Sequence, residues 1–158
     1  MKSEKKEMPG TYQLLSLLEE PSGKLPRVEI NPEDLAFLWY TAGTTGVSKG
    51  VMITHKNFIT ATHSTDYVLD FNEQDVNLQI MPMFHCAGYL LGQFPLLYCG
   101  GAVVLLPFFN AKKCLEWIEG YGVSVIFAPP TFYLALMSEP DFKDYNLSTL
   151  RKYHSSNG

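Results

Sequence analysis

The 158-residue sequence has only three cysteines and no cluster of positive charge. Cys86, Cys99 and Cys114 are widely spaced and odd in number, which argues against a disulfide framework and against a zinc knuckle. We expect each to be a small buried residue in a protein of a reducing, cytoplasmic compartment. The net charge is −4 and the basic run at residues 2–6 is interrupted by a glutamate, so nothing indicates a nucleic-acid partner. The polar N-terminus has no apolar segment typical of a signal peptide.

Charged side chains are also absent from residues 76–111. A helix that spans a membrane needs about 20 consecutive apolar residues. This stretch is interrupted by prolines, glycines and His85, which divide it into pieces of strand and short-helix length. We interpret it as the buried interior of an α/β protein and expect no transmembrane segment. A membrane hairpin is the alternative.

Strand-like and helix-like segments alternate along the chain. We expect strands at residues 35–40, 76–81, 101–106, 123–128 and 150–154, a short extended piece at 51–54, and helices at 54–69, 86–97, 111–121 and 130–138. Residues 103–106 and 123–127 are apolar at nearly every position, which is typical of a parallel sheet buried on both faces. The sequence therefore predicts an α/β fold with a doubly wound, mostly parallel sheet flanked by helices over residues 31–158. Residues 1–30 are interpreted as a lead-in segment that is partly flexible.

A loop rich in glycine and threonine follows the first predicted strand, at residues 41–50. Because residues 35–40 are continuously apolar, we expect that strand to be buried and the loop to lie at the carboxyl edge of the sheet, where α/β proteins bind ligands. The glycines permit close approach of the backbone, and the threonines, Ser48 and Lys49 supply donors that suit phosphate oxygens. The spacing differs from the G-x-x-x-x-G-K pattern of a P-loop. The residues alone leave two interpretations open, an anion-binding loop and a flexible surface turn.

The loop closely resembles the threonine- and glycine-rich signature of the adenylate-forming superfamily, which includes acyl- and aryl-CoA synthetases. Ala42 and Ser48 depart from that signature, but neither change removes the phosphate cradle. Residues 81–88 resemble the family's histidine segment, residues 127–131 its double-proline turn, and residues 147–158 the approach to its adenine-binding loop. The resemblance covers the chain from about residue 31 to its end. The matching fixed positions of the signature are Thr41, Gly43, Thr44, Thr45, Gly46, Lys49 and Gly50.

The resemblance implies ATP-dependent activation of a carboxylic acid as an acyl-adenylate, followed by transfer to a thiol such as coenzyme A. It also implies that His85 and Lys49 are catalytic, and it assigns no residue of the chain to a metal. The superfamily's enzymes are much longer, so we expect a fragment of the large domain that is inactive alone. Such a fragment would not bind coenzyme A and would self-associate through exposed apolar surface. The ATP phosphates, accompanied by Mg²⁺, would be held by Thr41, Ala42, Gly43, Thr44, Thr45, Gly46 and Lys49.

Two alternatives to a ligase fragment remain open at this point. The first is a module that binds a nucleotide or phosphate without catalysis. The second is a truncated remnant of a ligase gene. The identity of the acid is not specified by these residues.

Overall fold

The computed structural model describes residues 23, 27–42 and 46–155. The chain divides after Asn31, and the unit that begins at Pro32 carries all of the described helices and strands. Most of the predicted lead-in segment lies outside the described residues, as do Gly43, Thr44 and Thr45 of the loop.

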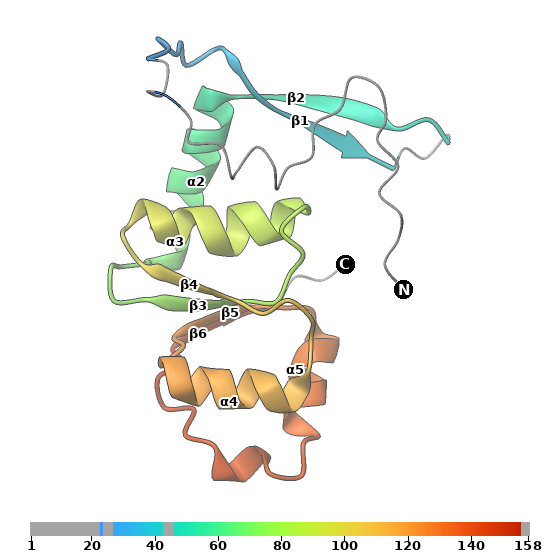
Figure 1. Ribbon diagram of the computed structural model, residues 1–158, viewed down its shortest axis with the longest axis vertical. Helices are drawn as coiled ribbons and strands as arrows, with labels where there is room; N and C mark the ends of the chain where they lie inside the picture. The colour runs from blue at the N-terminus through green and yellow to red at the C-terminus, as the bar shows by residue number, and fades with distance from the viewer. Residues whose placement is uncertain (1–22, 24–26, 43–45, 156–158) are drawn as a thin grey trace. The chain divides into compact units, whose positions relative to one another are not determined.

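A parallel sheet of four strands lies at the centre of this unit (Figure 1). The spatial order is β4-β3-β5-β6, and all three neighbouring pairs are parallel. Each strand lies within a segment for which the sequence predicts one, although the strands are shorter than expected. Their bounds are Val76–Gln79 (β3), Ala102–Leu105 (β4), Val125–Phe127 (β5) and Lys152–His154 (β6).

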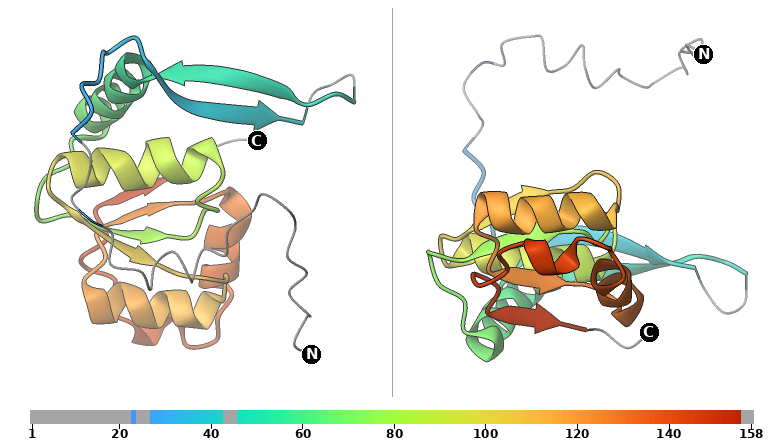
Figure 2. Two further views of the ribbon diagram at one scale, coloured as in Figure 1. Left: turned by 45° about the horizontal axis from the view of Figure 1, so that its top comes forward. Right: turned by 90° about the horizontal axis from the view of Figure 1, so that it is seen from below.

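Helices cover both faces of the sheet, so the predicted doubly wound arrangement is confirmed (Figures 1 and 2). One face carries the π-helix η1 and the helix α3, which connect β3 to β4; the other face carries α4 and α5, which lead to β5 and β6. A short 3₁₀-helix, η2, follows α5. The bounds are Ala87–Gln93 (η1), Phe94–Tyr98 (α3), Ala111–Tyr121 (α4), Pro130–Met137 (α5) and Phe142–Asp144 (η2).

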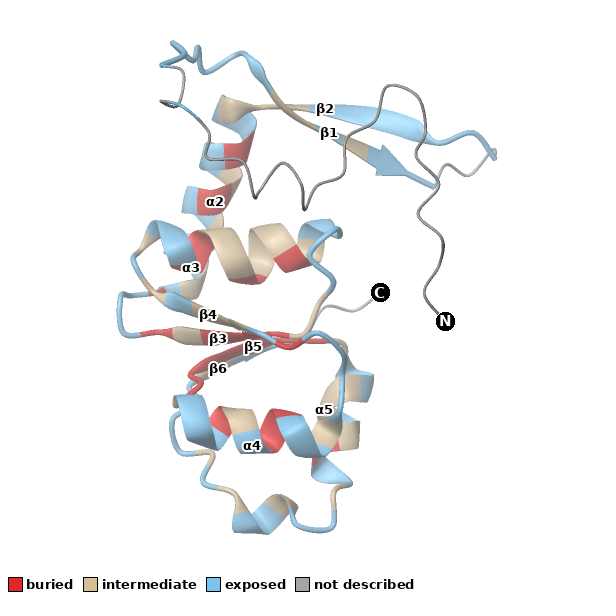
Figure 3. Cartoon of the chain, viewed as in Figure 1, coloured by how far each residue is buried: buried red, intermediate tan, exposed pale blue. Residues whose placement is uncertain are grey.

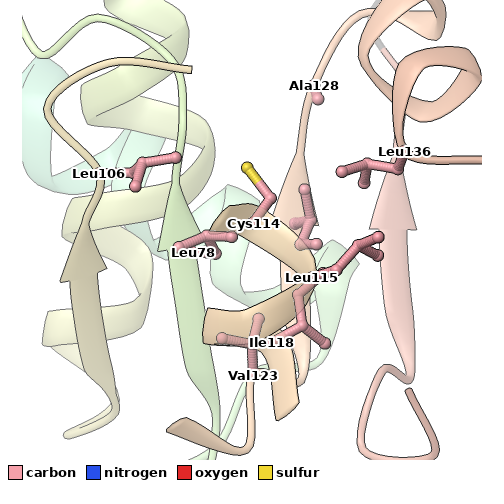
Figure 4. Close-up of a cluster of buried hydrophobic side chains, with 9 residues drawn as sticks. Leu78, Leu106, Cys114, Leu115, Ile118, Val123, Ala128 and Leu136 are labelled. Atoms are coloured by element: carbon pink, nitrogen blue, oxygen red, sulfur yellow. The ribbon is translucent and has the colours of Figure 1, made fainter. Parts of the chain in front are cut away.

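The two faces of the sheet have separate cores because successive strand residues point in opposite directions. Ile126 faces α4, whereas its neighbours Val125 and Phe127 pack with Leu96 on the α3 side. Figure 3 shows the resulting burial of the central strands. The larger core, drawn in Figure 4, consists of Leu78, Leu106, Cys114, Leu115, Ile118, Val123, Ile126, Ala128 and Leu136.

The first strand was predicted to be buried, and this prediction is wrong. Leu35–Thr41 (β1) pairs antiparallel with Lys49–Thr54 (β2) in a separate two-stranded sheet, and Leu38 and Tyr40 are 50% and 71% exposed. The connection at residues 42–48 is the reason, because parallel strands need a crossover of about a dozen or more residues. The loop is therefore the turn of a hairpin and does not follow a strand of the parallel sheet.

Helix α2 extends from His55 to Leu69, close to the prediction, and its start is fixed by a capping box. The Thr54 hydroxyl accepts a hydrogen bond from the Asn57 N–H (3.1 Å), and the Asn57 side-chain oxygen accepts one from the Thr54 N–H (3.2 Å). These bonds satisfy backbone donors that no preceding turn of helix can reach.

Thr54→Ala is expected to lower the free energy of unfolding by about 1 kcal/mol, because the Asn57 N–H loses its acceptor. Urea denaturation followed by circular dichroism measures the loss. Thr60→Ala, at an exposed position within the same helix, is the control and should not destabilise the protein. Equal midpoints for the two variants would contradict the assignment of the cap.

The uncharged stretch forms β3, η1, α3 and β4. The continuous helix predicted for residues 86–97 is instead a π-helix followed by a short α-helix, and the Phe94 N–H donates to the Tyr89 carbonyl five residues earlier. Pro95 comes next in the chain and has no N–H with which to continue the bonding pattern. In the described part of the chain, no helix combines the length and apolarity needed to cross a membrane.

Candidate functional site

The hairpin presents the described part of the loop to solvent. Thr41 and Lys49 are direct cross-strand partners next to the turn, so their side chains stand on the same face. Ala42, Gly46 and Lys49 are exposed. Gly46 has φ +85°, a conformation that disfavours side chains and explains the glycine there. The hydroxyl of Thr41 and the ammonium of Lys49 can therefore both reach an anion at the turn.

His85 lies on a different element, in the segment that follows the carboxyl end of β3. Its imidazole is exposed, and Nδ1 accepts a hydrogen bond from the Ala87 N–H (3.1 Å). Its backbone N–H donates to the Pro82 carbonyl (3.1 Å), which closes a turn between β3 and η1. Among the described residues, no hydrogen bond or ion pair joins His85 to the loop at residues 41–50.

The position of His85 matches the place where doubly wound folds bind ligands. The connection that leaves β3 goes to one face of the sheet, and those that leave its neighbours β4 and β5 go to the other. Such a divergence opens a crevice outside the carboxyl ends of the strands. A cleft of about 460 Å³ lies there, lined by residues 79–84 and 105–107. Phe84, next to His85, is 87% exposed.

Cys86 lies in the same segment and corrects one prediction. It is exposed, whereas Cys114 is fully buried in the larger core and Cys99 is partly buried. The turn after β3 carries Cys86 out to the carboxyl edge instead of into the sheet. Its Sγ lies 3.8 Å from Nδ1 of His85.

Five aromatic rings connect the hairpin to the helix that follows His85. Phe37 contacts Trp39 on β1 and Phe58 on α2, with ring centroids 5.8 and 4.9 Å apart. Trp39 contacts Tyr89 of η1 at 6.4 Å. Tyr89 contacts Phe94 at 5.2 Å, and Phe94 contacts Phe58 at 4.8 Å, so the contacts close into a circuit. This aromatic circuit joins the base of the hairpin to the π-helix.

The buried Cys114 thiol and the partly buried Tyr133 hydroxyl are unsuited to nucleophilic or acid–base chemistry. Burial raises the pKa of the Cys114 thiol to about 11. Burial also raises the pKa of Tyr133 to about 12, against the effect of hydrogen bonds with the backbone. The Tyr133 hydroxyl lies 3.0 Å from the Ile126 carbonyl oxygen and 2.9 Å from that of His154, so it ties α5 to β5 and β6. Both groups are structural.

The family is decided by sequence comparison. A family model described as "AMP-binding enzyme" matches residues 2–157. The chain belongs to the AMP-binding enzyme family. 4-Coumarate–CoA ligase 2 of Nicotiana tabacum is 36% identical over 148 residues, which are 90% of this chain and 27% of that ligase. 4-Coumarate–CoA ligase 4 of Arabidopsis thaliana is 32% identical over 146 residues, 90% of this chain and 26% of the ligase.

Solved structures share the fold. The inhibitor-bound N-terminal domain of FACL13 from Mycobacterium tuberculosis superposes with a TM-score of 0.81 and 28% identity, over 89% of this chain and 35% of that domain. ATP-bound MatB from Rhodopseudomonas palustris gives a TM-score of 0.75 and 26% identity, over 89% of this chain and 27% of MatB. The chain thus spans about a quarter of the length of the curated relatives that it matches.

The structure brings some predicted site residues together and adds others. Thr41, Ala42, Gly46 and Lys49 share the hairpin turn, while His85 lies apart from them in sequence and on another element. No residue of β3 was predicted to belong to the site, although two of its amide side chains are buried beneath η1. Their signal was present, because β3 alternates polar and apolar residues (Val76-Asn-Leu-Gln79) where a fully apolar strand is usual.

Proposed function

We propose that the chain takes part in the ATP-dependent joining of a carboxylic acid to a thiol, by way of an acyl-adenylate. In that reaction the carboxylate attacks the α-phosphorus of ATP and pyrophosphate leaves; the thiol sulfur then attacks the acyl carbon and AMP leaves. Membership of the AMP-binding family is the observation that carries this proposal. The names of the relatives, which include 4-coumarate–CoA ligases, support it.

The chain's contribution would be the phosphate-binding loop and part of the acyl site. Thr41, Ala42, Gly46 and Lys49 are exposed at the hairpin, and with Gly43, Thr44 and Thr45 they would hold the ATP phosphates. Lys49 would neutralise charge on the phosphates as pyrophosphate departs. His85, beside the cleft that follows β3 and β4, would orient the substrate carboxylate.

Mg²⁺ would arrive with the nucleotide. The loop offers N–H, hydroxyl and ammonium donors, which suit phosphate oxygens, whereas Mg²⁺ requires oxygen ligands that are commonly carboxylates and phosphates. Within the described ranges, no three acidic, histidine or cysteine side chains gather to hold a cation. The phosphate oxygens of ATP would be among its ligands.

Lys49→Ala should weaken pyrophosphate binding by at least about tenfold, because a hydrogen bond to a charged group contributes about 1.5–3 kcal/mol. Isothermal titration with pyrophosphate and with ATP measures the effect. Lys143→Ala, which removes an exposed lysine from η2, is the matched control and should bind normally. Equal affinities of the two variants would contradict the role of Lys49.

The same samples test whether the chain completes the reaction. With about a quarter of the relatives' length, the chain is expected to release no pyrophosphate from ATP with any of a panel of fatty and aryl acids. Robust turnover would overturn that expectation. ATP binding that depends on Lys49 but never responds to an added acid would favour a non-catalytic phosphate-binding module.

A further inference from the structure

Two amide side chains of β3 are buried beneath the π-helix. Asn77 is fully buried and Gln79 is 5% exposed, and they point to the face opposite Leu78. The Asn77 side-chain N–H donates to the Gln79 side-chain oxygen (3.2 Å). Room for both amides comes from η1, where a Cβ on Gly92 would lie 2.8 Å from the Asn77 nitrogen and 3.0 Å from the Gln79 oxygen. Burying two amides is costly unless they form hydrogen bonds, so their partners are informative.

Gln79 is bonded to the segment that carries His85. Its side-chain N–H donates to the Met81 carbonyl at 2.6 Å, immediately before the turn that begins at Pro82. The His85 N–H closes that turn on the Pro82 carbonyl, and the Gly88 N–H donates to the His85 carbonyl (2.9 Å). The turn that carries the exposed His85 is thus held by a hydrogen bond from the buried amide of Gln79.

The hydrogen bonds also fix which imidazole nitrogen carries the proton. Nδ1 of His85 accepts from the Ala87 N–H, and an accepting nitrogen of a neutral imidazole bears no proton. The proton of the neutral ring is therefore on Nε2. Because the ring is exposed, Nε2–H is available as a donor to an oxyanion at the carboxyl edge of the sheet.

We propose that Gln79 is a positioning residue for His85. By holding the Met81 carbonyl, it keeps the turn where Ala87 can donate to Nδ1, and so it maintains the Nε2–H form of the ring. The anion that this N–H would meet, the substrate carboxylate or a phosphate, rests on the proposed function. The tautomer of His85 and its dependence on Gln79 do not rest on the proposed function.

Long-range ¹H–¹⁵N NMR of the imidazoles tests the proposal on the chain without ligand. The spectrum is recorded near pH 8.5, about two units above the usual histidine pKa of about 6.5, so that the rings are neutral. His85→Gln assigns the His85 signals by their loss. The expected wild-type pattern is a protonated Nε2 and an unprotonated Nδ1. In Gln79→Met, which preserves length but removes both hydrogen bonds, both nitrogen shifts should move towards the average of the two tautomers.

Two comparisons separate positioning from a general loss of structure. The signals of His55 and His63, which lie on α2, should not move in Gln79→Met, and Gln74→Met at an exposed position before β3 should leave the His85 pattern unchanged. Retention of the wild-type His85 pattern in folded Gln79→Met would overturn the role of Gln79. If that variant does not fold, Gln79→Leu, which also removes both hydrogen bonds but has a shorter side chain, should give the same shift.

The wild-type spectrum alone is also decisive, because a protonated Nδ1 on His85 would refute the proposal. Pyrophosphate and hexanoate are then added separately to identify the anion. A change in the His85 Nε2–H signal with either one shows which oxyanion the ring meets. Failure of both to bind would count against the proposed function and would leave the tautomer result standing.

Discussion

Arg151→Met is expected to lower the free energy of unfolding by about 3–5 kcal/mol, because it leaves a buried carboxylate without its cationic partner. Asp75 is 1% exposed and lies just before β3, at the amino edge of the parallel sheet. The Arg151 guanidinium donates to both of its carboxylate oxygens, with Nε 2.7 Å from Oδ1. The Ser124 hydroxyl (2.6 Å) and the Asn72 N–H (3.1 Å) donate to the same carboxylate.

Urea denaturation of Arg151→Met measures the loss, and Lys112→Met provides the matched control. The ion pair of Lys112 with Asp141 spans 3.4 Å, but both side chains are 55% exposed, so its removal should cost less than about 1 kcal/mol. The double variant Asp75→Asn/Arg151→Met should recover part of the stability, because it removes the unpaired charge. Equal losses for Arg151→Met and Lys112→Met would show that the buried pair contributes no more than a surface pair.

The same carboxylate gives stability a defined pH dependence. Burial alone would raise the pKa of Asp75, but the hydrogen bonds from Ser124 and Arg151, the Asn72 N–H and the charge of Arg151 together hold it below its usual value. A group whose pKa is lower in the folded state stabilises the fold above its unfolded pKa of about 3.9 and loses that contribution as the pH falls through the folded value. Denaturation midpoints between pH 6 and pH 2 should fall less steeply in Asp75→Asn than in the wild type.

Gly88→Ala is expected to destabilise the unit by about 1–3 kcal/mol, because a Cβ at this position has no space. It would overlap the Pro82 carbonyl oxygen and lie 3.0 Å from the Pro82 carbonyl carbon and 3.1 Å from the Gln79 side-chain nitrogen. The Pro82 carbonyl is backbone and cannot rotate away, so the turn that carries His85 would have to shift. The His85 imidazole signals should therefore change together with the denaturation midpoint.

Gly120→Ala is the control for this substitution. Gly120 lies within α4, and no atom lies within 4 Å of the position its Cβ would take. Alanine is the better helix former, so this variant should be more stable than the wild type by about 0.5–1 kcal/mol. A Gly88→Ala protein as stable as the wild type would show that the π-helix can move away from the turn.

Local signals were sufficient to predict much of the parallel sheet and its helices. Thr54 marked the start of α2, Asn110 lies directly before α4 as its N-cap, and the apolar runs at residues 103–106 and 123–127 predicted strands covered on both faces. These elements depend on helix capping, hydrophobic periodicity and burial, and all three can be read from residues that are close together in the sequence. The parallel pairing of β3 with β4 and β5 follows from the helices between them.

The predictions from sequence were wrong or incomplete where the structure depends on contacts between residues that are distant in the sequence. The apolar character of residues 35–40 was taken as burial in the main sheet, although a connection of residues 42–48 permits only a hairpin. The bond between Asp75 and Arg151 joins residues far apart in sequence, and the support of His85 by Gln79 depends on a turn whose shape the sequence does not state. The roles of Lys49, His85 and the rest of the loop stay predictions.

The aromatic circuit has a mechanical consequence for the hairpin. Phe37 contacts a ring of α2 and Trp39 contacts a ring of η1, so this part of the hairpin is held against two elements. Tyr40 and the residues that follow lie beyond these contacts, and Tyr40 is 71% exposed. If the turn closes around an anion, the hairpin therefore has to bend beyond Trp39, because the strand is held in place up to that residue.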